Sequence, residues 1–167
     1  MTEFYHAGFQ LVKVRAWMLG SLVIGAAGCW WGWDQFTTYG TRPADGGVLA
    51  PLFTRILIGG FIAGFALAVT FGLWIYAKLY VASLAWEPVL ARLIVRTPTY
   101  FGTRTEQFQL SQIEGTSRRR GQFSNPVGVS VDAPWHALSI RGKRLSYIVD
   151  AQGRWLDPEL ARQLLKL

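Results

Sequence analysis

The amino-acid sequence predicts a membrane protein: a hairpin of two transmembrane helices, then a small antiparallel β domain with a C-terminal helix. The nearest common architecture for the β domain is a pleckstrin-homology-like sheet or barrel. Hydrophobic residues make up 51% of the 167 residues and charged residues 16%, against about 25% charged residues in soluble domains. The apolar residues gather in two long uncharged blocks, and short alternating segments follow after residue 86. This composition excludes a disordered chain and disfavours a free-standing soluble enzyme.

The two uncharged blocks are long enough to cross a bilayer. They cover residues 16–33 and 56–77. Because a helix rises about 1.5 Å per residue, about 20 apolar residues span a hydrocarbon core of about 30 Å. A chain of this length has no means to bury two helices that are apolar on every face. We therefore expect transmembrane helices at about 11–33 and 56–80, joined by a loop over residues 34–55.

Small residues lie four positions apart in both expected spans. Gly28 and Gly32 form one pair, and Gly60 and Gly64 form another. Such pairs let two helix backbones approach each other closely. Two interpretations stay open: the spans pack on each other as a hairpin, or the glycines form a docking face for another membrane subunit.

Positive charges close to the spans predict the orientation in the membrane. Lysine and arginine gather on the cytoplasmic side of membrane proteins. Five basic residues lie on the tail side, and two lie in the loop: Lys13, Arg15, Lys78, Arg92 and Arg96 against Arg42 and Arg55. We therefore expect an inner (cytoplasmic) membrane protein with both termini in the cytoplasm, or in the matrix if the membrane is mitochondrial. The cores of the spans contain no charged residue or histidine, which argues against a transporter, channel or pump acting alone.

Residues 86–167 have the pattern of a small sheet domain, and residues 1–85 hold an N-terminal tail and the two spans. Asp157 followed by Pro158 predicts the start of a helix over 157–166. The turn Arg141-Gly142-Lys143 suits a tight hairpin between two strands. We expect five or six mostly antiparallel strands, in short apolar or alternating segments over 92–96, 106–110, 127–131, 136–140 and 144–149.

A basic face is predicted on the β domain. Arg118, Arg119 and Arg120 form the densest run of charge, and Lys143 and Arg144 follow in a turn. Anionic lipid attracts each such residue by about 1 kcal/mol. The face therefore has two interpretations, a lipid or partner surface, or a solvated loop on the cytoplasmic side. Nucleic acid is not expected, because no recognition helix or long basic arm accompanies the run.

Sequence motifs that carry catalytic chemistry are missing. The chain contains no H-E-x-x-H, C-x-x-C, Walker A, G-x-G-x-x-G or G-x-S-x-G sequence. A single cysteine, Cys29, excludes a zinc site built on several thiolates. His6 and His136 fit surface and strand positions better than the role of a ligand or general base. We therefore expect no catalytic residue, no metal, no cofactor and no small-molecule substrate.

Three stretches of the β domain carry a family resemblance. They are TPTYFG at 97–102, FQLSQI at 108–113 with a basic turn after it, and LSIRGKRLSYIVD at 138–150 followed by Gln152-Gly153. Together they resemble the soluble part of the transmembrane protein 223 family. The resemblance covers roughly residues 90–156, and the two-span plan extends it. It implies two spans, a small sheet domain and a part in the biogenesis of cytochrome c oxidase, with no catalytic residues to carry over.

These observations favour a non-catalytic accessory subunit or assembly factor of an inner-membrane respiratory complex of the copper/haem oxidase type. Its partners would be other membrane protein subunits. One alternative is a membrane-anchored module that binds lipid or protein through the basic face. Another is an accessory membrane component of a secretion or conjugation machine. That alternative rests on a weaker resemblance of Gly8-Phe9-Gln10 and Gly153-Arg154 to the membrane-anchoring region of type IV coupling proteins.

Overall fold

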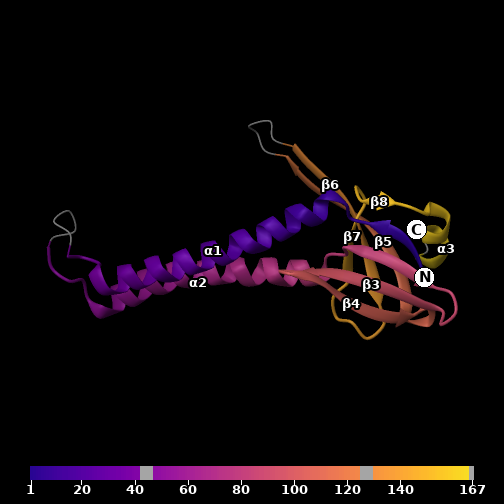
Figure 1. Ribbon diagram of the computed structural model, residues 1–167. Helices are drawn as coiled ribbons and strands as arrows, with labels where there is room; N and C mark the ends of the chain where they lie inside the picture. Colours follow the sequence, from indigo (N-terminus) through magenta and orange to yellow (C-terminus); the bar gives the residue numbers. More distant parts are fainter. Residues whose placement is uncertain (42–46, 125–129, 166–167) are drawn as a thin grey trace. The chain divides into compact units, whose positions relative to one another are not determined.

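The computed structural model describes residues 1–41, 47–124 and 130–165, with the backbone alone at 122–124 and 130–132. The chain divides into two compact units (Figure 1). Residues 16–75 form the first unit, which we call the helical hairpin. Residues 1–15 and 76–167 form the second, which we call the sheet unit. Each unit is described in turn.

The helical hairpin consists of α1 (Phe9–Thr38) and α2 (Leu52–Leu79), apart from the ends that belong to the sheet unit. Both helices are long and apolar enough to cross a membrane. Only 22% of the most apolar stretch of α1 and 11% of that of α2 are buried, whereas a core helix of a soluble protein is mostly buried. The prediction of two apolar helices is therefore confirmed, and their exposed apolar surfaces fit a lipid environment.

Polar contacts join α1 to α2 in the middle of the hairpin and near the connecting loop. The Thr70 hydroxyl donates to the Ser21 carbonyl at 2.8 Å, in the middle of the hairpin. Near the connecting loop, Arg55 donates to the Phe36 carbonyl at 3.1 Å and lies 5.5 Å from the centre of the Phe36 ring. Because α1 continues to Thr38 and α2 begins at Leu52, the connection is shorter than the loop expected over 34–55.

The first sheet of the sheet unit has five antiparallel strands in the order β4-β3-β2-β1-β8. The strands are β1 (Thr2–His6), β2 (Ser83–Glu87), β3 (Arg92–Thr99), β4 (Gly102–Gln109) and β8 (Arg154–Trp155). The first residues, expected to be an N-terminal tail, form β1, between β2 and β8. Phe4 and Tyr5 are fully buried there. Gly8, with φ of +59°, turns the chain after the strand.

The second sheet has three antiparallel strands in the order β5-β6-β7. They are β5 (Ile113–Ser124), β6 (Ser130–Ile140) and β7 (Tyr147–Asp150), and a short 3₁₀ helix, η2 (Leu110–Gln112), leads from β4 into β5. Since β7 pairs only with residues 135–138 of β6, the outer part of the β5–β6 hairpin extends beyond it (Figure 1). The strand expected over 127–131 falls largely outside the described residues, and β6 begins at Ser130.

The described strands form two separate sheets, so the closed barrel considered in the sequence analysis is wrong. Pairing stops at η2, which takes the place of a β4–β5 ladder. Tyr80, directly after α2, forms an isolated bridge with Ile148 of β7. The antiparallel sheet domain itself is confirmed. Its core takes fully buried side chains from both sheets and from the last helix, among them Leu84, Leu93, Val95, Leu138, Val149 and Leu165.

The last helix, α3 (Pro158–Leu165), is confirmed and begins as the sequence predicts. The Asp157 carboxylate accepts a hydrogen bond from the Leu160 amide at 2.9 Å, as expected of an N-cap residue. Ala161, Leu164 and Leu165 are buried on its inner face. The helix packs on β1 and β5 and thereby covers the core beside both sheets.

Candidate functional site

A pocket of about 260 Å³ in the sheet unit contains four basic side chains and one carboxylate. The basic residues come from three places in the chain: the end of α2, strand β4 and the turn between β6 and β7. They are Lys78, Arg104, Lys143 and Arg144, and the carboxylate is that of Glu106. Lys143 and Arg144 belong to the predicted basic face, Lys78 is one of the charges that predict the orientation, and Glu106 has no predicted role.

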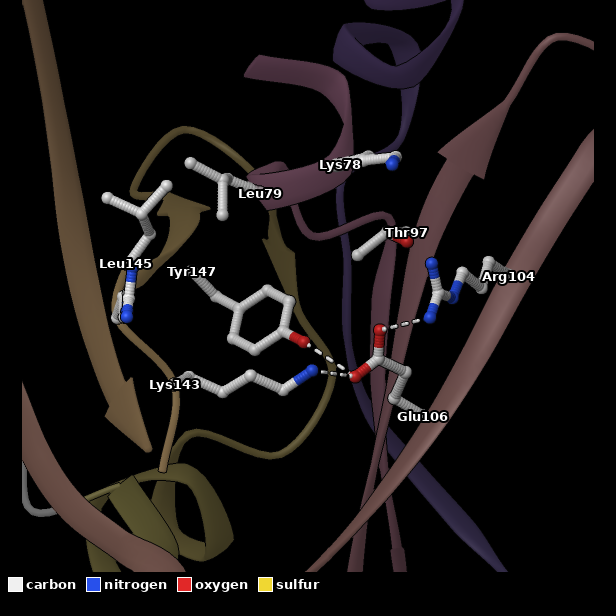
Figure 2. Close-up of a pocket in the computed structure, with 9 residues that line it drawn as sticks. Lys78, Leu79, Thr97, Arg104, Glu106, Lys143, Leu145 and Tyr147 are labelled. Carbon is white, nitrogen blue, oxygen red and sulfur yellow. Dashed lines mark hydrogen bonds and ion pairs between the residues drawn. The ribbon is translucent and has the colours of Figure 1, made fainter. Parts of the chain in front are cut away.

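Glu106 lies at the centre of the charged contacts in this pocket (Figure 2). Its Oε2 atom accepts hydrogen bonds from the Lys143 ammonium at 2.6 Å and from the Tyr147 hydroxyl at 3.0 Å. Its Oε1 atom lies 3.3 Å from the Arg104 guanidinium. Figure 2 shows Lys143 and Tyr147 approaching the carboxylate from one side and Arg104 from the other. One carboxylate thus holds two cations and a phenol at fixed positions.

The spacing of residues along β4 explains this arrangement. Side chains two positions apart in a strand point to the same face of a sheet, so Arg104 and Glu106 point the same way. β4 is an edge strand of the first sheet, and β7, which carries Tyr147, is an edge strand of the second. The contacts of Glu106 therefore connect the edges of the two sheets. The alternating Arg-x-Glu pattern was the available signal in the sequence, but it does not reveal the partner strand.

The protonation states of the cluster follow from its surroundings. Burial disfavours the charged form of Glu106, but the hydrogen bonds from Lys143 and Tyr147, with the charges of Lys143 and Arg104, outweigh it and lower the pKa of Glu106. Burial, followed by the hydrogen bond to Glu106, raises the pKa of Tyr147. At neutral pH Glu106 is therefore ionised and Tyr147 is a neutral donor. Four cations against one carboxylate leave the pocket with a net charge of +3. This arrangement favours binding of an anion over proton transfer.

Arg118, Arg119 and Arg120 lie elsewhere in the sheet unit. They are exposed on β5, opposite residues 134–136 of β6. Lys143 and Arg144 follow the other end of β6, where Ile140 pairs with Ile113. The five steps from position 113 to position 118 correspond to about 17 Å of strand. The structure therefore separates the predicted basic face into a strand part and a pocket part. Neighbouring arginines also alternate between the two faces of β5.

The two glycine pairs occupy different surfaces of the helical hairpin. A Cβ atom on Gly28 would collide with the side chain of Ala66, and one on Gly32 would lie 2.6 Å from the carbonyl oxygen of Gly59. These two glycines therefore allow α1 and α2 to touch. A Cβ atom on Gly60 or Gly64 would meet no atom within 4 Å. The second pair is open, on a surface of α2 that the hairpin does not use.

A buried polar cluster beside the core has a structural explanation. The Asp150 carboxylate accepts a hydrogen bond from the Tyr80 hydroxyl at 3.3 Å, and its backbone carbonyl accepts one from Tyr5 at 3.1 Å. Burial raises the pKa of both tyrosines, so they stay neutral donors. His136 lies edge-on to the Trp155 ring at 6.1 Å. Burial, followed by the charge of Arg118, lowers its pKa.

In the part of the chain that the structure describes, no three histidine, cysteine, aspartate or glutamate side chains are placed to hold a metal ion together.

Comparison with known proteins identifies the family. Residues 48–165 match the TMEM70/TMEM186/TMEM223 protein family. The match covers more than half of the chain and includes α2, strands β2–β8 and α3. No curated protein matches the sequence. Membership fits a role in the assembly of membrane complexes in general, and it agrees with the resemblance found in the sheet domain. The chain therefore belongs to the TMEM70/TMEM186/TMEM223 protein family.

Proposed function

We propose that this protein is a non-catalytic accessory subunit or assembly factor of an inner-membrane complex of the respiratory, copper- or haem-oxidase type. The family match over residues 48–165 carries the proposal. The choice of an oxidase rests on the resemblance of residues 97–102, 108–113 and 138–150 to the transmembrane protein 223 branch. The partners are other membrane protein subunits, together with lipids around the spans.

The open side of α2 is the proposed docking surface for a partner helix. Gly60 and Gly64 lie one helical turn apart and are exposed. Gly28 and Gly32 are already used inside the hairpin, so they are not available to a partner. In a membrane, small residues on an exposed helix face let another backbone approach closely. A partner helix that packs on Gly60 and Gly64 would therefore gain contacts that bulky side chains would prevent.

Both ends of the chain are proposed to lie on the cytoplasmic side, or on the matrix side in a mitochondrion. β1 precedes the first span, β2 follows the second, and the two strands pair. Paired strands must lie on the same side of a membrane. Their side follows from Lys13, Arg15 and Lys78, which flank the spans on the sheet-unit side, through the positive-inside rule.

Substitution of the open glycines tests the proposed function. The protein is purified from native membranes in mild detergent, and co-purifying proteins are identified by mass spectrometry and an optical spectrum for haem and copper. We expect the wild type to bring down oxidase subunits and the Gly60→Leu/Gly64→Leu variant to lose them. Gly72→Leu is the matched control, because Gly72 is equally open on the same helix but points about 80° away from Gly64.

Each negative result has a separate meaning. If the double variant retains its partners, docking through Gly60 and Gly64 is wrong. If the wild type is recovered without any subunit of a membrane complex, the assembly proposal itself is wrong. Equal loss in the Gly72→Leu control would point to general damage of α2 and would also count against the proposed surface.

A further inference from the structure

The charged pocket exposes its cations and covers its carboxylate. The side chains of Arg104 and Lys143 are 57% and 41% exposed, whereas that of Glu106 is 20% exposed. An anion in solvent therefore meets positive charge first. Glu106 holds these two cations in place, and the basic side chains that line the pocket outnumber its single carboxylate.

Lys78 places this pocket close to the membrane surface. It directly follows the uncharged run over residues 56–77, in the last turn of α2. A cation at this position lies at the level of the lipid headgroups, where anionic lipids attract basic residues. Leu79 and Leu145 line the same pocket, and Leu145 is 56% exposed. Apolar side chains beside the charges suit a ligand that carries both a charged headgroup and an acyl chain.

Polar donors in the pocket fit a phosphate group. Lysine and arginine supply several N–H donors each, and phosphate oxygens accept charge-assisted hydrogen bonds from them. The Tyr147 hydroxyl is already committed to Glu106, so recognition falls to the basic side chains. Their positions on α2, β4 and the β6–β7 turn converge on one cavity, whereas Arg118 to Arg120 point to alternating faces of a strand.

We propose that Lys78, Arg104, Lys143 and Arg144 bind a phosphate-bearing anion in this pocket, with the headgroup of an anionic phospholipid as the source that the position at the end of α2 favours. Inorganic phosphate or a soluble phosphate ester shares this chemistry. The inference does not depend on which complex the protein serves. The proposed lipid-binding site is therefore this pocket and not the exposed run Arg118 to Arg120 on β5.

Binding of a defined lipid to the full-length protein tests the proposal. The protein in detergent is titrated with phosphatidylglycerol or with phosphatidylcholine, and bound lipid is counted by native mass spectrometry. We expect the wild type to prefer phosphatidylglycerol and Arg104→Gln/Arg144→Gln to lose affinity for it by about tenfold or more. Arg118→Gln/Arg120→Gln removes the same charge from β5 and should leave the affinity unchanged.

Two further measurements keep the result decisive. Arg104→Lys/Arg144→Lys retains the charge and should retain the preference for phosphatidylglycerol, and thermal unfolding shows whether each variant is folded. Displacement of the lipid by an excess of inorganic phosphate would assign the pocket to soluble phosphate, and resistance to displacement would assign it to the lipid. Unchanged binding in Arg104→Gln/Arg144→Gln, or an equal loss in the β5 variant, would overturn the proposal.

Discussion

At the scale of single residues, Glu106 combines a structural and an electrostatic role. Its carboxylate accepts hydrogen bonds from Lys143 and Tyr147 and forms an ion pair with Arg104. Because the group is largely covered, these contacts are screened less by water than an exposed ion pair is. The same contacts position Lys143 and Arg104 at the pocket. Loss of this one charge should therefore affect stability and anion binding together.

The variant Glu106→Gln should be less stable than the wild type by about 1–2 kcal/mol near neutral pH. The pKa of Glu106 is lower in the folded protein than its ordinary value of 4.5. Its stabilising effect is therefore fully present above that value and disappears as the pH falls through the folded pKa. Thermal unfolding at neutral and acidic pH measures both the difference and its loss.

A matched control for this variant is Glu114→Gln. Glu114 is 51% exposed and lies 3.8 Å from Arg141, so its ion pair should contribute little to stability. If Glu106→Gln unfolds at the same temperature as the wild type at neutral pH, the carboxylate does not hold the two sheets together.

At the scale of the elements, β1 is the part of the fold that is hardest to recognise in the sequence. It has five residues and lies ahead of a helix, far in sequence from the strands on either side of it. Its signal is the run Thr2-Glu3-Phe4-Tyr5, rich in residues of high strand propensity, before the chain breaks at Gly8. Propensity alone is weak in a short strand, because pairing with β2 and β8 supplies the stability.

The sheet unit should need β1 to fold. A chain of residues 76–167 lacks the partner of β2 and β8 and the buried side chains of Phe4 and Tyr5. Since α3 packs on β1, a short linker after residue 167 followed by residues 1–15 should restore the strand. We expect cooperative thermal unfolding for this permuted chain and none for residues 76–167 alone. Equal unfolding curves for the two chains would show that β1 is dispensable.

The two long helices, in contrast to β1, are easy to recognise in the sequence. Charge-free runs identify both spans, because a bilayer excludes charged side chains whatever the neighbours are. The helix ends differ from those expected, since α1 continues through Asp34 to Thr38. The hydroxyl of Thr38 donates to the Asp34 carbonyl at 2.8 Å and helps to extend the helix. The sequence does not tell which glycine pair faces the other helix. The structure shows that Gly28 and Gly32 lie between α1 and α2, whereas Gly60 and Gly64 are open.

At the scale of the whole molecule, the two spans are an insertion between paired strands. β1 and β2 are neighbours in the first sheet, and the chain passes through α1 and α2 between them. A chain that crosses the membrane twice returns to the side from which it started. The pairing of β1 with β2 requires both strands to lie on one side of the membrane, and two crossings meet this requirement.

Cysteine labelling tests the orientation of the protein. In a Cys29→Ala background, single cysteines are placed at the exposed positions Thr41, in the connection between the spans, and Gln163, in α3. A membrane-impermeant maleimide added to right-side-out vesicles should label Thr41→Cys alone, and inside-out vesicles should give the reverse pattern. Labelling of both positions from one side would rule out a double crossing. Labelling of Gln163→Cys alone in right-side-out vesicles would show that the orientation is opposite to the one proposed.

Local patterns in the sequence are enough to predict the two apolar helices, the antiparallel sheet domain, the terminal helix with its Asp157 cap, and the family. These features depend on local patterns of charge, alternation and capping, which a linear sequence contains in full. Three features come from the folded chain: residues 2–6 complete the first sheet, the described strands form two sheets and no closed barrel, and Glu106 contacts Lys143, Arg104 and Tyr147 in one pocket. Each of these depends on contacts between residues far apart in the chain. Packing in three dimensions sets the order of the strands and brings distant side chains together. The spacing of residues along the chain does not reveal either.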